Sequence, residues 1–223
     1  LSFTPGTWVE SIQVTKGAGS VVNGYESISG QINTELIKPL KDIPVFVNAY
    51  GSTDSRFELN THFNKKISDD WATSLYVHGN TRVSKNDMND DGFLDNPLGQ
   101  QINIINRWQY ACSETGWITF FNVKYMNDKK QTGQVDFDRT LHKGSTQYWG
   151  SEINTERLDF SSKVGYVFKD MPFQSIGFQN AFSSHNQNSY FGLRGYDIKQ
   201  QSYYSNLIFN SIINNTMNKF ATG

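Results

Sequence analysis

Residues 9–39 read VESIQVTKGAGSVVNGYESISGQINTELIKP, and this stretch decides how the rest of the chain is organised. Ile12 and Val14 alternate with polar neighbours, small residues interrupt the pattern, and a second alternating run ends at Pro39. Because glycine permits positive φ and close backbone approach, this spacing is typical of short strands and tight turns packed in a confined space. The residues that mark the predicted turns are Lys16, Gly17, Gly24 and Gly30.

After Pro39 the chain changes character and alternates apolar and polar residues over long runs. Within residues 57–64, for example, Phe57, Leu59 and Phe63 share one predicted face, whereas Glu58, Asn60 and His62 share the other. A period of two indicates a β-strand with two different faces. We therefore expect an all-β fold in which about eight such strands form an antiparallel meander.

The predicted connections alternate between short turns and long polar loops. The long loops are expected at 84–99, 127–151 and 185–201, and Trp71, Trp117 and Phe173 lie at or next to short turns. Short turns on one side, long loops on the other and aromatic residues near the turns are typical of transmembrane barrels. The pattern favours part of a transmembrane antiparallel β-barrel over its alternative, a soluble β-sandwich with one solvated face.

Composition excludes several other classes. A formal net charge of −1 offers no electrostatic surface for nucleic acid. The sequence contains no run of about 18 apolar residues, so it predicts no transmembrane helix. Cys112 is the only cysteine, so a disulfide framework is impossible, and we expect this residue to be a small strand side chain. Neither end resembles a natural terminus, so we expect a fragment of a longer protein.

Residues 9–39 resemble the end of the plug domain of TonB-dependent outer-membrane receptors. That family closes its plug with a strand of the form I-E-V-x-[KR]-G, a small-residue turn, an aromatic residue near a glycine, and G-x-I-N. The matching residues here are Ile12, Val14, Lys16, Gly17, Gly24, Tyr25, Gly30, Gln31, Ile32 and Asn33. Two departures are the absence of the usual proline after the [KR]-G pair and the position of Tyr25 after its glycine, which affect the expected turn geometry.

The resemblance implies that residues 1–40 are the C-terminal part of a plug domain. Residues 41–223 would then be the first part of a barrel that has about 22 strands in this family. It further implies contacts between the plug and the barrel wall, with Gln31, Asn33, Glu35 and Glu26 facing Arg107, Lys124 and Lys163.

The function implied by the resemblance is active uptake of a scarce ligand, such as a siderophore–iron complex or cobalamin, across the outer membrane of a Gram-negative bacterium. The implied partners are outer-membrane lipid, the small-molecule or metal-chelate ligand, and the TonB complex, whose contact box lies outside this sequence. No enzymatic activity is expected. Two alternatives stay open at this point: a small outer-membrane β-barrel enzyme and a soluble β-sandwich binding module.

Two clusters have the composition of metal sites. Asp87, Asn89, Asp91 and Asp95 have the spacing of a calcium-binding loop around Gly92, although Leu98 in place of a bidentate glutamate excludes an EF-hand. The competing interpretation is a polar loop rich in Asx turns. His62 and His78 are expected on the polar face of neighbouring strands, where they would lie nearly opposite each other. They would then either bind a transition metal as a pair or simply line the interior.

Lys16–Ser20 lacks the residue order of a phosphate-binding loop, and no nucleophile motif is present.

Overall fold

The computed structural model describes residues 4–18 and 28–223, and within them the chain is almost entirely β-structure. The described part contains one short 3₁₀ turn, η1 (Gly6–Trp8), and no helix long and apolar enough to cross a membrane. The strands that follow are β1 (Val9–Lys16), β2 (Gly30–Leu36), β3 (Val45–Gly51), β4 (Arg56–Lys66), β5 (Trp71–Arg82), β6 (Leu98–Cys112), β7 (Trp117–Gly133), β8 (Gly150–Val167), β9 (Ser175–Phe191), β10 (Arg194–Gly195), β11 (Ile198–Ile213) and β12 (Asn215–Thr222).

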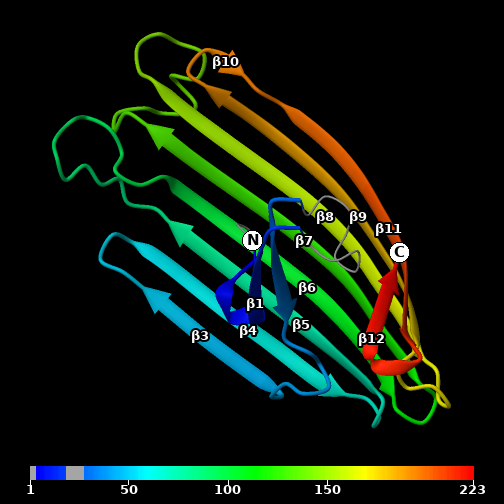
Figure 1. Ribbon diagram of the computed structural model, residues 1–223. Helices are drawn as coiled ribbons and strands as arrows, with labels where there is room; N and C mark the ends of the chain where they lie inside the picture. The colour runs from blue at the N-terminus through cyan, green and yellow to red at the C-terminus, as the bar shows by residue number, and fades with distance from the viewer. Residues whose placement is uncertain (1–3, 19–27) are drawn as a thin grey trace.

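Strands β3 to β12 form one antiparallel meander in the order β12-β11-β9-β8-β7-β6-β5-β4-β3, with β10 paired to β9. Each long strand pairs with its neighbours along the chain, and the sheet bends into an open, curved wall whose edges are β3 and β12 (Figure 1). The all-β class and the antiparallel meander predicted from the sequence are confirmed. The wall is consistent with part of a barrel, and it does not close on itself within the described residues.

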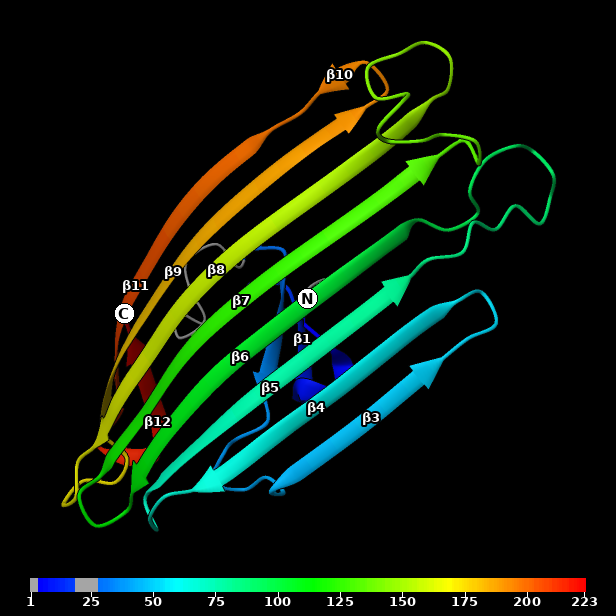
Figure 2. The same cartoon turned by 180° about the vertical axis from the view of Figure 1, so that it is seen from behind.

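The connections separate into two groups at opposite ends of the wall (Figure 2). Short turns at 67–70, 113–116 and 168–174 lie at one end, whereas the loops at 83–97 and 134–149 lie at the other, together with the short turn at 52–55. We refer to these as the turn end and the loop end. The turn at 113–116 requires Gly116, because its φ is +79° and a Cβ there would lie 2.3 Å from the Val167 carbonyl oxygen.

Two of the predicted loops are wrong in their bounds. Strand β7 continues to Gly133, so the second loop is shorter than 127–151. The predicted loop at 185–201 does not exist as such, because β9 continues to Phe191, β11 begins at Ile198 and β10 lies between them. Residues 185–189 are polar on both faces, so they lack the alternation that marks a strand although their backbone stays in the ladder.

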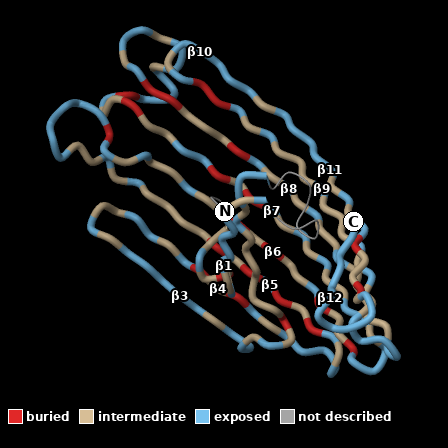
Figure 3. Tube along the Cα trace, in the orientation of Figure 1, coloured by how far each residue is buried: buried red, intermediate tan, exposed pale blue. Residues whose placement is uncertain are grey.

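On the wall, large apolar side chains are exposed and many polar side chains are buried, which is the reverse of a water-soluble sheet. On β4, Phe57, Leu59 and Phe63 are 57%, 49% and 48% exposed, whereas Asn60 and His62 are each 2% exposed. The facing predicted from the alternation is therefore correct, with apolar side chains on the convex face and polar ones on the concave face. Figure 3 shows buried positions at the foot of the N-terminal strands and others toward the loop end of the wall.

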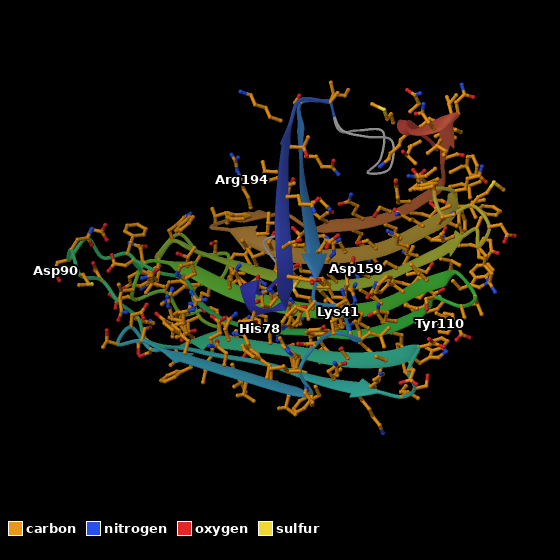
Figure 4. All side chains as sticks on the ribbon, turned by 60° about the horizontal axis from the view of Figure 1, so that its bottom comes forward. Lys41, His78, Asp90, Tyr110, Asp159 and Arg194 are labelled. Carbon is orange, nitrogen blue, oxygen red and sulfur yellow. The ribbon has the colours of Figure 1, made fainter. Side chains whose placement is uncertain are left out.

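The concave face receives the N-terminal hairpin, which consists of β1 and β2. The two strands pair antiparallel from Val9 with Leu36 to Lys16 with Gly30, and the hairpin stands upright on the wall in Figure 4. Gly17 has a φ of +89°, which favours glycine where the chain leaves β1. A Cβ on Gly30 would lie 3.0 Å from the Thr15 carbonyl oxygen, so close approach of the strands favours glycine there too. The fourth predicted turn residue, Gly24, lies outside the described residues.

Aromatic side chains gather on the convex face close to the turn end. Trp71 contacts Tyr110 with ring centroids 4.9 Å apart, and Trp117 contacts Tyr166 at 5.0 Å. Both are cross-strand pairs in direct register, and Phe173 is exposed within the turn at 168–174. Amphipathic aromatic rings in such a band are typical of a boundary between hydrocarbon and water.

Candidate functional site: the interface between hairpin and wall

Trp8 is the centre of the interface, although the sequence analysis did not single it out. Its side chain is 1% exposed, and its ring centroid lies 5.7 Å from Tyr76 and 6.5 Å from His78. Ile105 on β6 completes the buried cluster, and Leu36 on β2 packs against it. A small apolar core thus fastens the base of the hairpin to an otherwise polar wall.

The segment after β2, residues 37–42, is held by polar side chains of the wall. Tyr76 donates its hydroxyl to the Ile37 carbonyl at 3.0 Å. Asn64 donates its amide to the carbonyls of Pro39, at 2.6 Å, and Asp42, at 3.0 Å. The Leu40 backbone N–H donates to the Gln109 side chain at 3.1 Å. Because irregular backbone needs partners once it is shielded from water, these side chains make it possible for the chain to leave the hairpin along the wall.

The two histidines belong to this interface and do not face each other. In the register of β4 and β5, His62 pairs with Tyr76, and His78 pairs with Asn60, so the expectation that they lie opposite one another is wrong. His62 stacks on Phe46 at 4.9 Å, and its Nε2 lies 2.9 Å from Asp42 Oδ2.

His78 has polar partners on both ring nitrogens. Its Nδ1 lies 2.7 Å from Asn60 Oδ1, and its Nε2 lies 3.1 Å from Gln101 Oε1. It sits near the foot of the hairpin in Figure 4. Both imidazoles therefore act as polar wall residues, and among the described residues no group of three or more His, Cys, Asp or Glu side chains is arranged to hold a metal ion.

A polar cavity of about 590 Å³ lies beside the hairpin. Gln31, Asn33 and Glu35 line it from β2, and Arg107 and Lys163 line it from the wall. The β2 residues therefore face the wall cations across this cavity, as predicted, but they do not pair with them directly. Asn33 instead donates to Gln13 at 3.4 Å, and Glu35 lies 3.3 Å from Lys38. Lys124 does not line this cavity, and the remaining predicted partner, Glu26, lies outside the described residues.

Lys38 closes the base of the hairpin electrostatically. Its ammonium lies 3.2 Å from Glu10 on β1 and 3.3 Å from Glu35 on β2. The hydrogen bond to Glu10, followed by that to Glu35, holds the pKa of Lys38 above its ordinary value. The three groups join both strands of the hairpin to the segment that leads into the wall.

The predicted calcium-loop residues lie far from the hairpin, in the loop at 83–97 that carries Asp90 in Figure 4. Both Asp87 oxygens accept backbone N–H groups, from Asp91 at 3.1 Å and Gly92 at 2.8 Å. Asp95 accepts from Met88 N at 2.8 Å, and Asp91 accepts from Phe93 N at 2.8 Å and from the Asn89 amide at 3.0 Å. The Asp91–Phe93 bond is an Asx turn, and the other bonds tie carboxylates to more distant backbone N–H groups, so together they order the loop. Calcium binding would have to share or replace these hydrogen bonds, and it stays a prediction.

The two long loops are joined to each other at the loop end. Phe93 forms an isolated β-bridge with Gln134, Leu94 N donates to the Gly133 carbonyl at 2.9 Å, and Val135 N donates to the Gly92 carbonyl at 2.9 Å. The loops therefore form one connected rim above β5 to β8.

Three comparisons with known proteins return no match. No protein-family model matches the chain. No curated protein and no solved structure matches it either.

Proposed function

We propose that this chain is a segment of a TonB-dependent outer-membrane receptor that takes up a scarce ligand, a siderophore–iron complex, cobalamin or a similar molecule. The observation that carries the proposal is the pairing of an exposed apolar convex face with a polar concave face that holds the N-terminal hairpin. In this proposal residues 1–40 close the plug domain, residues 41–223 begin the barrel, and the apolar face contacts outer-membrane lipid.

Lipid is the environment that fits the convex face. Large apolar side chains are exposed on each of the eight strands from β3 to β9 and β11, including Val47, Leu75, Val123, Phe160 and Leu207. A face of this size left in water would promote association, whereas the outward residues of a transmembrane barrel are apolar as a rule. The β-sandwich alternative needs a second sheet over the apolar face, and in the described residues the one other sheet lies on the polar face instead.

The concave face fits a wet interior that holds a movable plug. Beyond the Trp8 cluster, the hairpin meets the wall across a polar cavity lined by Arg107 and Lys163. Polar groups of this kind exchange protein partners for water at modest cost, so a pull from the TonB complex would loosen this side before the apolar anchor. The anchor would keep the end of the plug on the wall while more distant plug segments move.

The enzyme alternative has less support. A small barrel enzyme would need a cluster of titratable side chains with a nucleophile or metal at one rim. The described rim at the loop end instead uses its carboxylates to accept backbone N–H groups.

The test uses the full-length protein in its native host. We expect it in the outer-membrane fraction, resistant to alkaline carbonate extraction, and we expect a deletion strain to lose growth on one defined iron or cobalamin source. Growth should return with the wild-type gene and fail to return when the TonB complex is inactivated. Recovery of the protein in a soluble fraction would overturn the membrane assignment, and ligand uptake that is independent of TonB would overturn the transport mechanism.

A further inference from the structure

A hollow of about 670 Å³ lies on the convex face of the wall near the loop end. The strand register places Ala49, Leu59, Gly79, Ile102 and Asn127 in one row across β3 to β7. All five line the hollow, together with Phe57, Thr81 and Gln100 from the next row toward the loop end. The apolar side chains in these rows are those expected to face lipid.

Gly79 creates the hollow because it leaves a gap between larger neighbours. Phe57 and Leu59 are exposed on one side of it, and Ile102 is exposed on the other. A Cβ built on Gly79 meets only the Gln101 carbonyl oxygen, at 3.8 Å, which is ordinary van der Waals contact. Neither backbone conformation nor close packing therefore requires glycine here, and a larger side chain would fill the space without strain.

A second hollow of about 320 Å³ adjoins the first toward the loop end and shares Thr81 and Gln100 with it. Four basic residues, Arg82, Lys129, Lys130 and Arg139, and one acidic residue, Glu152, line it. Arg82 pairs with Asp54 at 2.8 Å, Lys130 pairs with Asp128 at 2.9 Å, and Arg139 lies 3.9 Å from Glu152.

Lys129 is the cation left for a ligand. It is exposed, it follows Gln100 in the outward row, and within residues 4–18 and 28–223 it has no ion pair. The apolar hollow thus continues along the convex face to Lys129, with Thr81 and Gln100 between them as hydrogen-bonding groups, whereas Arg82 and Lys130 occupy the alternate row, which faces the concave side.

We propose that these adjoining hollows bind one membrane lipid that carries a phosphate in its headgroup. The acyl chain lies over Gly79 between Leu59 and Ile102, and the phosphate contacts Lys129. The proposal rests on the membrane location proposed above. Because bulk lipid tails are as apolar as the hollow, selectivity would come from the shape at Gly79 and from the charge at Lys129.

The experiment uses full-length receptor purified in a neutral detergent and native mass spectrometry with added lipid. The probes are phosphatidylglycerol and a diacylglycerol with the same acyl chains, which lacks phosphate. We expect one phosphatidylglycerol to be retained, with about a fivefold preference over diacylglycerol, as for one lysine on an anionic headgroup. Gly79→Leu should abolish retention of both lipids, and Lys129→Glu should remove the preference alone.

Matched controls make the same changes elsewhere on the molecule. Thr119→Leu adds the same side chain on the convex face near the turn end, and Lys169→Glu makes the same charge change in the turn at 168–174. Neither should alter lipid retention. For each variant, a difference in gel migration between unheated and heated samples shows that the barrel has folded.

Three results would overturn the proposal: equal retention of the two lipids by wild-type protein, unchanged retention in Gly79→Leu, or full displacement by glycerol phosphate at the same concentration. The last would assign the site to a free phosphate ester. These outcomes are distinct from failure of the proposed function, because a receptor that lies in the membrane and takes up its ligand can still lack lipid selectivity.

Discussion

Trp8→Ala is expected to release the N-terminal hairpin from the wall without unfolding the wall. The side chain is 1% exposed and makes the apolar contacts of the hairpin base with Tyr76 and Ile105. A buried tryptophan removes on the order of 200 Å² from water, which corresponds to about 5 kcal/mol at ~25 cal/mol/Å². Measured truncations of this type cost ~3–5 kcal/mol. We therefore expect about 4 kcal/mol, which is roughly a thousandfold increase in the undocked population.

Hydrogen–deuterium exchange of the full-length protein measures this release directly. A two-stranded hairpin is at best marginally stable alone, so the amides of β1 and β2 should exchange faster once docking is lost. Exchange in β7 and β8 should stay unchanged, because their ladder does not depend on Trp8. Trp8→Phe, which keeps an aromatic ring, should give an intermediate acceleration.

Trp117→Ala is the matched control, because it removes the same side chain from the convex face, where Trp117 is 44% exposed. It should leave hairpin exchange unchanged. The reasoning fails if Trp8→Ala accelerates β1 and β2 by less than about tenfold, or 1.4 kcal/mol, or if Trp117→Ala accelerates them equally.

Four further predictions concern other parts of the molecule. Tyr76→Phe removes the hydroxyl that donates to Ile37 and should accelerate exchange in residues 37–42 by about 1 kcal/mol, or roughly fivefold. Val123→Arg on the convex face should reduce assembly into vesicles by ~2–4 kcal/mol, whereas Asn122→Arg on the concave face should assemble normally; equal effects would contradict the assigned facing. Hydrogen bonds from the Thr140 hydroxyl and backbone hold the pKa of Asp138 below its ordinary value, so its stabilisation of the loop at 134–149 is present above about pH 4 and lost as the pH falls through the lowered pKa. Loop exchange in wild type and Asp138→Asn should therefore differ near neutral pH and converge in acid. If calcium binds Asp87 and Asp95, titration of the full-length protein should slow exchange in the loop at 83–97 relative to Asp87→Asn, and unchanged exchange would refute the calcium site.

The sequence by itself determined which residues face which side of each strand. Successive side chains of a strand point to opposite faces, so the alternation of Phe57, Leu59 and Phe63 with Asn60 and His62 encodes the facing locally. Glycine is also favoured at Gly17, where φ is positive, and at Gly30, the first residue of β2, where the two strands approach closely.

The length of a strand depends on its neighbouring strands, whereas the facing of its side chains depends only on the local sequence. Residues 185–189 carry polar side chains on both faces, so they resemble a loop, yet all of them pair with β8, and 185–187 also pair with β11. Their backbone extends the ladder because the neighbouring strands are already long. A pattern read along one strand contains no information about that length.

Only the tertiary structure decided how the hairpin is held and what the wall can bind. Tyr76 and Ile37 are 39 residues apart, and Leu40 and Gln109 are 69 residues apart, so no local pattern could pair them. The predicted contacts joined polar and acidic hairpin residues to wall cations, whereas the structure holds the hairpin base with the buried Trp8 and the following segment with side-chain-to-backbone hydrogen bonds. The hollow at Gly79 likewise forms from five strands in register. Such features depend on where distant segments meet in space, whereas facing depends only on the neighbours in sequence.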